Sequence, residues 1–353
     1  MNSVHSYKRR SRILTCALSI LTPLRGNRRS VPLRVPTLSA LLLIFLAHGA
    51  LANDAEALVR RMSEATGALT YDGIFVYVRD GQIDTMRVVH TRNEDGTELE
   101  RLVSVSGPQG EVTRDGTRVT CTLTDDTGLL EKRVPRDYVG LRLSNPIDQL
   151  NRHYEFAIIG NGRVAGRLTH QVSIEPLVQD RYSLRLWIDV ASNLLLKSAV
   201  IGVNNQVLEQ VMFTQLSIGE PLASDALDAD LSAGGYTWYT NTKSDSVPDT
   251  PVADDFTIGW LPSGFEMKNQ QIHSISSNGV PVKNVIYSDG LAVVSVFVEK
   301  LVSDTLPLQG YTTMGAVSAF SRVSPPYQIT VMGDVPQSTV RRIAASVALN
   351  ETN

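Results

Sequence analysis

The pattern of apolar and polar positions predicts a chain built mainly of strands. Runs rich in branched and aromatic side chains alternate with short stretches of Gly, Asn and Asp. So many consecutive hairpins favour a large antiparallel sheet over a parallel sheet wound by crossover helices. We expect strands at 71–79, 82–92, 98–105, 111–115, 118–124, 153–159, 164–175, 181–189, 194–203 and 206–217, and later at 265–275, 282–287, 292–299 and 326–332.

Helical spacing is confined to a few segments. Residues 53–69 place their apolar side chains on one stripe, with Asn53 or Asp54 as the expected N-cap. Residues 144–150 predict one short helix, and a last helix is expected near the C-terminus. The stripe positions are Ala57, Leu58, Met62 and Ala65 in the first helix and Val340, Ile343, Ala344 and Val347 in the last.

Several strands are apolar on both faces. In "YDGIFVYV" (71–78), Phe75 and Tyr77 project from one face and Ile74 and Val76 from the other. Either a curved sheet wraps a cavity for a lipid-like ligand, or both faces pack against helices, another domain or a second protomer. The pattern does not say which face lines a cavity. The candidate lining residues are Phe75, Tyr77, Leu184, Leu186, Trp187, Val211 and Phe213.

The first 52 residues have the character of an export signal. They contain eight basic residues and no acidic one, followed by the apolar run "LSALLLIFLA" (38–47) and the small-x-small sequence Ala50-Leu51-Ala52. The run is shorter than the roughly 20 residues that a membrane span needs. We therefore expect cleavage after Ala52, a mature chain that begins at Asn53, and a location in the periplasm.

Charge and cysteine content limit the possible partners and covalent cross-links of the mature chain. Subtracting the eight basic residues of the leader from 33 leaves 25 Lys and Arg against 36 Asp and Glu, a net charge of −11. This acidity argues against nucleic acid as a partner. Cys121 is the single cysteine beyond the leader, so an internal disulfide is excluded and a small buried side chain is expected.

A polar segment divides the mature chain. Eleven of the fifteen residues in "NTKSDSVPDTPVADD" (241–255) are Asn, Ser, Thr, Asp or Pro. Such a composition is typical of an interdomain linker. We expect a large domain at 53–240 and a smaller α+β domain at 256–353.

Motifs that suggest chemistry have simpler explanations. Gly160, Gly162 and Ala165 match the G-x-G-x-x-A spacing of a dinucleotide loop, but extended structure rather than a helix follows, so Gly160-Asn161-Gly162 is expected to be a hairpin turn. "DDTG" (125–128) and "YSDG" (287–290) are explained by turn chemistry. The mature histidines show no metal-ligand spacing and no close acidic companion: His90, His153, His170 and His273. We expect no enzyme, no cofactor and no metal.

Blocks on both sides of the linker resemble one family. "YDGIFVY", "MRVVH", "ERLVSVSG" and "EVTRDG" are similar to the N-terminal part of the RseB/MucB family of periplasmic regulators of the sigma-E envelope-stress response. "WLPSGF" (260–265), "YSDGLAVVSVFVE" (287–299), "GAVSAFSR" (315–322) and "VMGDVPQSTVRRIAASV" (331–347) resemble its C-terminal part.

The resemblance implies a fold and a function. The fold would be a LolA/LolB-like half-open barrel with covering helices, followed by a smaller domain that helps to hold the periplasmic part of an anti-sigma factor. Binding would shield that partner from DegS-type cleavage, and lipid-bearing signals, either lipoprotein acyl chains or lipopolysaccharide, would release it. The alternative is a carrier or chaperone for lipidated proteins, and a homodimer is an additional candidate assembly.

Overall fold

The computed structural model describes residues 39–107, 110–116, 118–124, 147–228, 236–240, 256–274, 281–301 and 307–349. Contacts divide the chain into two compact units, Met1–Ile44 and Phe45–Asn353, and the contacts below lie within the second. The expected linker at 241–255 and the "DDTG" stretch lie outside the described residues. The domain boundaries therefore remain a prediction.

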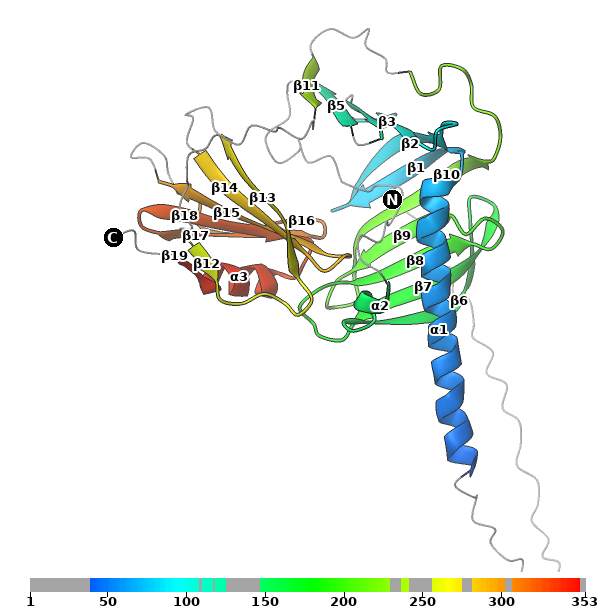
Figure 1. Cartoon of the computed structure of the whole chain (residues 1–353), viewed down its shortest axis with the longest axis horizontal. Coiled ribbons are helices and arrows are strands. Elements are labelled where there is room, and N and C mark those ends of the chain that lie inside the picture. The colour runs from blue at the N-terminus through cyan, green and yellow to red at the C-terminus, as the bar shows by residue number, and fades with distance from the viewer. Residues whose placement is uncertain are drawn as a thin grey trace, which may run out of the picture. The chain divides into compact units, whose positions relative to one another are not determined.

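A large antiparallel sheet confirms the predicted mainly β fold (Figure 1). Within the described residues it has the strand order β11-β5-β4-β3-β2-β1-β10-β9-β8-β7-β6, so each strand up to β5 pairs with its neighbour in sequence and β1 meets β10. The bounds are β1 Tyr71–Arg79, β2 Gln82–Arg92, β3 Glu98–Ser104, β4 Gly110–Asp115, β5 Arg118–Thr124, β6 Tyr154–Val164, β7 Arg167–Pro176, β8 Ser183–Asp189, β9 Leu195–Ile201, β10 Val207–Ile218 and β11 Tyr236–Thr240.

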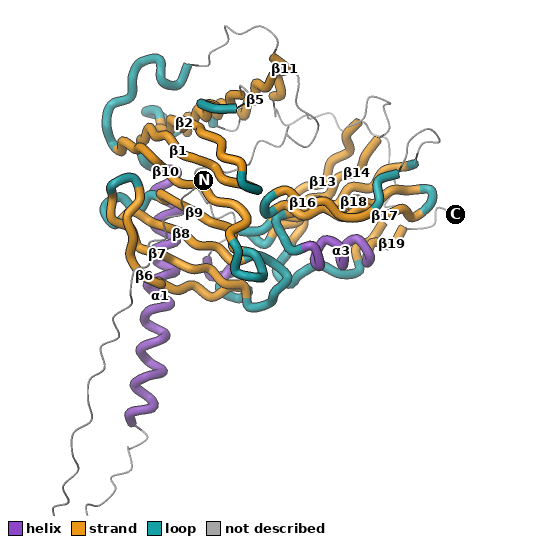
Figure 2. The backbone as a smooth tube through the Cα atoms, turned by 180° about the vertical axis from the view of Figure 1, so that it is seen from behind, coloured by secondary structure: helices purple, strands orange, loops and turns teal. Residues whose placement is uncertain are grey.

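A second sheet with one covering helix follows (Figure 2). Its order is β13-β14-β15-β18-β17-β16, and α3 packs on it through Val340, Ile343 and Ala344. A two-stranded ladder joins β12 to β19. The bounds are β12 Phe256–Ile258, β13 Glu266–Ser274, β14 Pro281–Ser288, β15 Val293–Lys300, β16 Gly310–Met314, β17 Val317–Ser324, β18 Tyr327–Gly333, α3 Gln337–Ser346 and β19 Val347–Leu349.

The first helix is longer than its amphipathic pattern predicted. Helix α1 spans Ser39–Ala68 instead of starting at Asn53 or Asp54, so the predicted N-cap is wrong. Leu and Ala, both strong helix formers, dominate residues 41–52, which extends the helix through that point. Among the described residues, no helix combines the length and the apolar character that crossing a membrane requires.

Two other boundaries differ from the predicted ones. Gly160-Asn161-Gly162 lies inside β6 rather than in a turn, and the hairpin turns at Ala165 and Gly166, which both have positive φ (47° and 77°). A two-residue turn of that kind matches the twist of the strands it joins, while Gly160 sits at a β-bulge beside Ile158. Helix α3 ends at Ser346, so Val347 starts β19 instead of completing the helical stripe.

Candidate functional site

Six of the seven predicted cavity residues share one face of the large sheet. Directly paired residues on antiparallel strands project from the same face. The register links Tyr77 to Val211, Val211 to Ser198, and Ser198 to Leu186. Phe75 and Phe213 form the next pair along that face, and Leu184 lies two residues from Leu186. This pairing unites positions up to 138 residues apart in sequence, from Phe75 to Phe213.

Trp187 belongs to the opposite face. Its row runs from Val76 through Met212 and Lys197 to Trp187. The Lys197 ammonium lies 4.3 Å from the centre of the Trp187 ring, which is a cation–π contact. Burial lowers the pKa of Lys197. Trp187 is partly buried against the cluster that also contains Phe75, Tyr77 and Phe213, but the register sets it in a different row from the other six.

One half of this face is covered by helices, as Figure 1 shows for α1 across β6–β9. We call this the helix-covered half. Its core joins the stripe of α1 and the short helix α2 (Ile147–Leu150) to side chains of β6, β7, β8 and β9. Leu186 is 1% exposed within it. The buried members are Ala55, Leu58, Val59, Met62, Ile147, Leu150, Tyr154, Phe156, Val172, Ile174, Leu186, Ile188 and Leu195.

The other half is built around aromatic side chains, and we call it the aromatic half. Tyr71, Phe75 and Tyr77 of β1 are buried together with Phe213, whose ring meets that of Phe75 edge to face at 5.9 Å. Gly73 leaves room for this ring, because a Cβ there would lie 2.6 Å from Phe213. The aliphatic face of β1 is only half-buried. The aromatic side chains thus point into the core, and a lipid cavity among them remains a prediction.

A buried charged cluster joins the β7–β8 loop to the second sheet. The guanidinium of Arg181 donates to the carboxylates of Asp180 and Asp289 and to the carbonyl of Ser263. Tyr154 Oη donates to Asp289 Oδ2 at 2.8 Å. Since all three donating nitrogens have acceptors, the cost of burying this cation is offset. We call these residues the Arg181 cluster.

Aromatic rings and backbone groups complete the Arg181 cluster. The Arg181 guanidinium lies 5.4 Å from the ring centre of Tyr154 and 5.1 Å from that of Phe265. Burial, followed by the Asp289 carboxylate, raises the pKa of Tyr154 well above its usual value. Tyr154 therefore stays a neutral donor. Because Tyr154 also belongs to the helix-covered core, the cluster connects that core to the second sheet.

Further contacts support the same junction. Thr339 Oγ1 of α3 donates to the Asp180 carbonyl at 2.8 Å. At another point, the backbone N–H groups of Gly315 and Ala316 donate to Asp80 and Glu209 at 2.7 and 2.9 Å. The turn between β16 and β17 thus contacts the edge of the β1–β2 hairpin and β10.

A small cavity of about 160 Å³ lies beside the Arg181 cluster. It is lined by polar groups and is below the volume typical of drug-sized ligand pockets, which starts near about 300 Å³. It therefore suits water or a small polar group rather than an acyl chain. The lining residues are Gln149, Arg152, His153, Gly264, Glu266 and Asp289.

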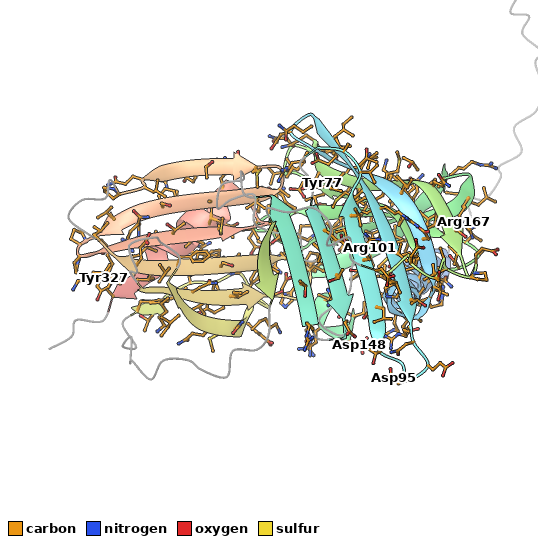
Figure 3. All side chains as sticks on the ribbon, turned by 90° about the horizontal axis from the view of Figure 1, so that it is seen from above. Tyr77, Asp95, Arg101, Asp148, Arg167 and Tyr327 are labelled. Carbon is orange, nitrogen blue, oxygen red and sulfur yellow. The ribbon has the colours of Figure 1, made fainter. Side chains whose placement is uncertain are left out.

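The sequence did not reveal two of these arrangements. "YSDG" does form a turn, in which Asp289 Oδ1 accepts from the N–H groups of Leu291 and Ala292, but its other oxygen holds Arg181. The prediction that His90 has no close acidic companion is wrong, because its Nε2 lies 2.9 Å from Glu98 Oε1 across the β2–β3 hairpin. Figure 3 shows another part of that hairpin, with Asp95 at its outer tip and Arg101 midway along β3.

Comparisons with known proteins cover both sheets. The MucB/RseB N-terminal domain model matches residues 54–231, and the MucB/RseB C-terminal domain model matches residues 250–348. The sigma factor AlgU regulatory protein MucB of Pseudomonas aeruginosa is 32% identical over 301 residues, 84% of this chain and 91% of that protein. The sigma-E factor regulatory protein RseB of Escherichia coli K12 is 25% identical over 316 residues, 86% of this chain and 94% of that protein.

Solved structures give the same result. The crystal structure of MucB in complex with MucA(peri) has a TM-score of 0.68 and 28% identity, and the match covers 84% of this chain and 100% of that chain. The crystal structure of MucB alone has a TM-score of 0.62 and 29% identity, covering 84% and 98% of the two chains.

Proposed function

Because the chain belongs to the MucB/RseB family, we propose that it is a periplasmic regulator that binds the periplasmic part of a membrane-anchored anti-sigma factor. The observation that carries this proposal is the similarity over both sheets to MucB, whose crystal structure was solved in complex with MucA(peri). A family of regulatory proteins also supports a role in binding rather than in catalysis.

We further propose that binding shields the anti-sigma factor from DegS-type proteolysis and that lipid releases it. The lipid would bind in the aromatic half of the face, at Phe75, Tyr77, Val211 and Phe213. Leu184 and Leu186 share this face but lie in the helix-covered half, and Trp187 lies on the reverse side. If lipid binds the free protein more tightly than the complex, it weakens partner binding by the same factor. The Arg181 cluster supports this coupling, since Tyr154 belongs to the helix-covered core and also holds Asp289 of the second sheet.

Binding is tested with the purified protein and the periplasmic segment of a MucA-type anti-sigma factor. Calorimetry should show saturable binding, and the bound segment should resist a DegS-type protease. A scrambled segment of the same composition is the control. Absence of binding contradicts the proposal, and recovery of mature lipoproteins alone from detergent-solubilised envelopes would favour the carrier function instead.

The export step has its own test. Intact-mass measurement of the native protein should give a chain that begins at Asn53 and fractionates with the periplasm. A species that retains "LLLIFLA" (41–47) would contradict cleavage after Ala52.

A further inference from the structure

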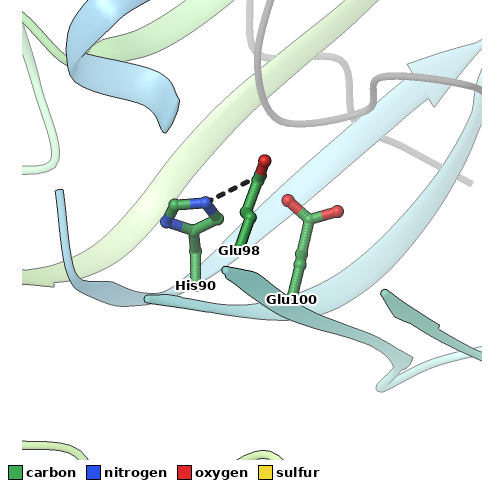
Figure 4. A group of neighbouring side chains, drawn as sticks. All are labelled: His90, Glu98 and Glu100. Carbon is green, nitrogen blue, oxygen red and sulfur yellow. Dashed lines mark hydrogen bonds and ion pairs between the residues drawn. The ribbon is translucent and has the colours of Figure 1, made fainter. Parts of the chain in front are cut away.

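Three potential metal ligands meet where β2 and β3 pair, in the aromatic half. His90 of β2 lies directly opposite Glu100 of β3, and Glu98 lies two residues from Glu100, so all three project from one face. One ligand atom from each side chain lies within 4.8 Å of those of the other two (Figure 4). Two ligands at positions i and i+2 of one strand and a third on the next strand form a compact set.

The His90 ring is fixed in the orientation that a ligand needs. Its side chain is fully buried, and its ring stacks on Tyr71 with a centroid distance of 4.8 Å. Nδ1 lies 2.7 Å from the carbonyl oxygen of Leu69, just beyond α1. A carbonyl only accepts, so Nδ1 carries the hydrogen, and Nε2 faces the carboxylate of Glu98. Metal-bound histidines are oriented by this type of carbonyl contact.

The contact between His90 and Glu98 calls for a cation. In the neutral ring with its hydrogen on Nδ1, Nε2 is an acceptor, and it lies 2.9 Å from the acceptor Oε1 of Glu98, which is 14% exposed. A proton between Nε2 and Oε1 would satisfy these two atoms but would make no contact with Glu100. A divalent metal ion would draw on all three side chains, and one imidazole with two carboxylates is a donor set suited to zinc.

Two arginines lie opposite the glutamates in the strand ladder and could compete with a metal ion for their carboxylates. Arg92 is opposite Glu98, but its guanidinium donates to the carbonyls of Gly67 and Gly96. Arg114 is opposite Glu100 on β4, so its guanidinium is a cation near the site that would compete with a metal for this carboxylate. This competition gives the site a variant that should strengthen binding as well as variants that should weaken it.

We propose that His90 Nε2, Glu98 and Glu100 bind one zinc-type divalent ion, with water completing the coordination. Through Leu69, the ion ties the end of α1 to the β2–β3 hairpin. An ion that binds the folded chain and not the unfolded one stabilises the fold by mass action. Metal binding at this site would therefore stabilise the aromatic half of the sheet.

The test is titration of the metal-stripped, exported protein with zinc chloride at neutral pH. Calorimetry should give one equivalent per chain, and cobalt(II) should give the visible absorption of a low-symmetry site. Glu100→Gln and Glu98→Gln should each weaken binding at least about tenfold, and Arg114→Gln should tighten it. The control Glu155→Gln, at an exposed position of β6, should leave binding unchanged.

Nitrogen chemical shifts of His90 supply a readout that is independent of affinity. Zinc should move the Nε2 resonance and leave Nδ1 protonated. The proposal is overturned if zinc shows no saturable binding, or if both glutamine variants bind zinc as tightly as the unmodified protein. It is also overturned if, at saturating zinc, the His90 resonances show that Nε2 carries a proton and no metal.

Discussion

In the helix-covered half, the sheet face packs against α1 and α2, whereas in the aromatic half the cluster consists of strand and turn residues and Leu69. Leu186 and Val211 lie in one row of this face, separated only by Ser198 of β9. Leu186 is buried beneath α1, and Val211 is half-buried. One row of side chains is therefore buried under a helix at one end and only half-buried at the other, and the lipid-binding proposal concerns the second end.

The largest effect is expected from Leu186→Ala. Removing a side chain that is 1% exposed beneath a helix should cost about 2–5 kcal/mol of unfolding free energy. Urea unfolding measures this cost, with the 60% exposed Leu168→Ala as control, for which a change within about 0.5 kcal/mol is expected. A cost for Leu186→Ala as small as that of the control would show that the helix cover is loose.

Tyr154→Phe should have an intermediate effect on stability and a specific effect on coupling. Losing one hydrogen bond to Asp289 should cost about 1 kcal/mol, because Arg181 and two backbone N–H groups still hold that carboxylate. The factor by which lipid weakens partner binding should shrink. Calorimetry of partner binding with and without lipid measures that factor. An unchanged factor would show that the Arg181 cluster does not couple lipid binding to partner binding.

Val211→Ala should cost less stability and more ligand affinity. Removing two half-buried methyl groups should lower the unfolding free energy by about 1 kcal/mol. Binding of a fluorescent fatty-acyl probe should weaken, whereas Leu186→Ala should retain it at temperatures where it stays folded. Equal loss of probe binding in both variants would erase the distinction between the two halves.

Acid should produce the smallest effect, through Asp189 at the end of β8. Burial alone would raise its pKa, but hydrogen bonds from Arg167 and Ser192 outweigh this, and the pKa is lowered overall. A carboxyl group with a lowered pKa in the folded state stabilises the fold above its unfolded pKa of about 3.9 and loses that contribution as pH falls. The stability difference between the unmodified protein and Asp189→Asn should therefore be constant near pH 7 and shrink below about pH 4. A difference that persists at low pH would contradict the assigned role.

Patterns among neighbouring residues predicted much of the fold. Features that depend on residues far apart in the sequence were not predictable in this way. The β1–β2 hairpin agrees residue for residue, because Asp80 and Gly81 adopt the positive φ values that a two-residue turn requires. The predicted turn at Gly160-Asn161-Gly162 is wrong, because the hairpin turn lies at Ala165 and Gly166. Strand β16 was not predicted, because it is largely exposed and lacks an apolar face. Strand β17 was not predicted either, although several of its residues are buried.

The candidate site was predictable only in part. Strand periodicity identified two-faced strands, and the pairing of β1 with β10 then showed which residues share a face. No local pattern indicates that Arg181 meets Asp289, 108 residues later. His90 and Glu98 are eight residues apart across a hairpin, where neither helical nor strand spacing signals contact.

The most direct test of the central claim is calorimetry of the intact protein with the anti-sigma periplasmic segment, repeated in the presence of an acylated lipid. The proposed function predicts saturable binding without lipid and weaker binding as lipid rises, with lipid affinity reduced by the same factor when the segment is present. Binding of the segment that is indifferent to saturating lipid, or no binding at all, would contradict it.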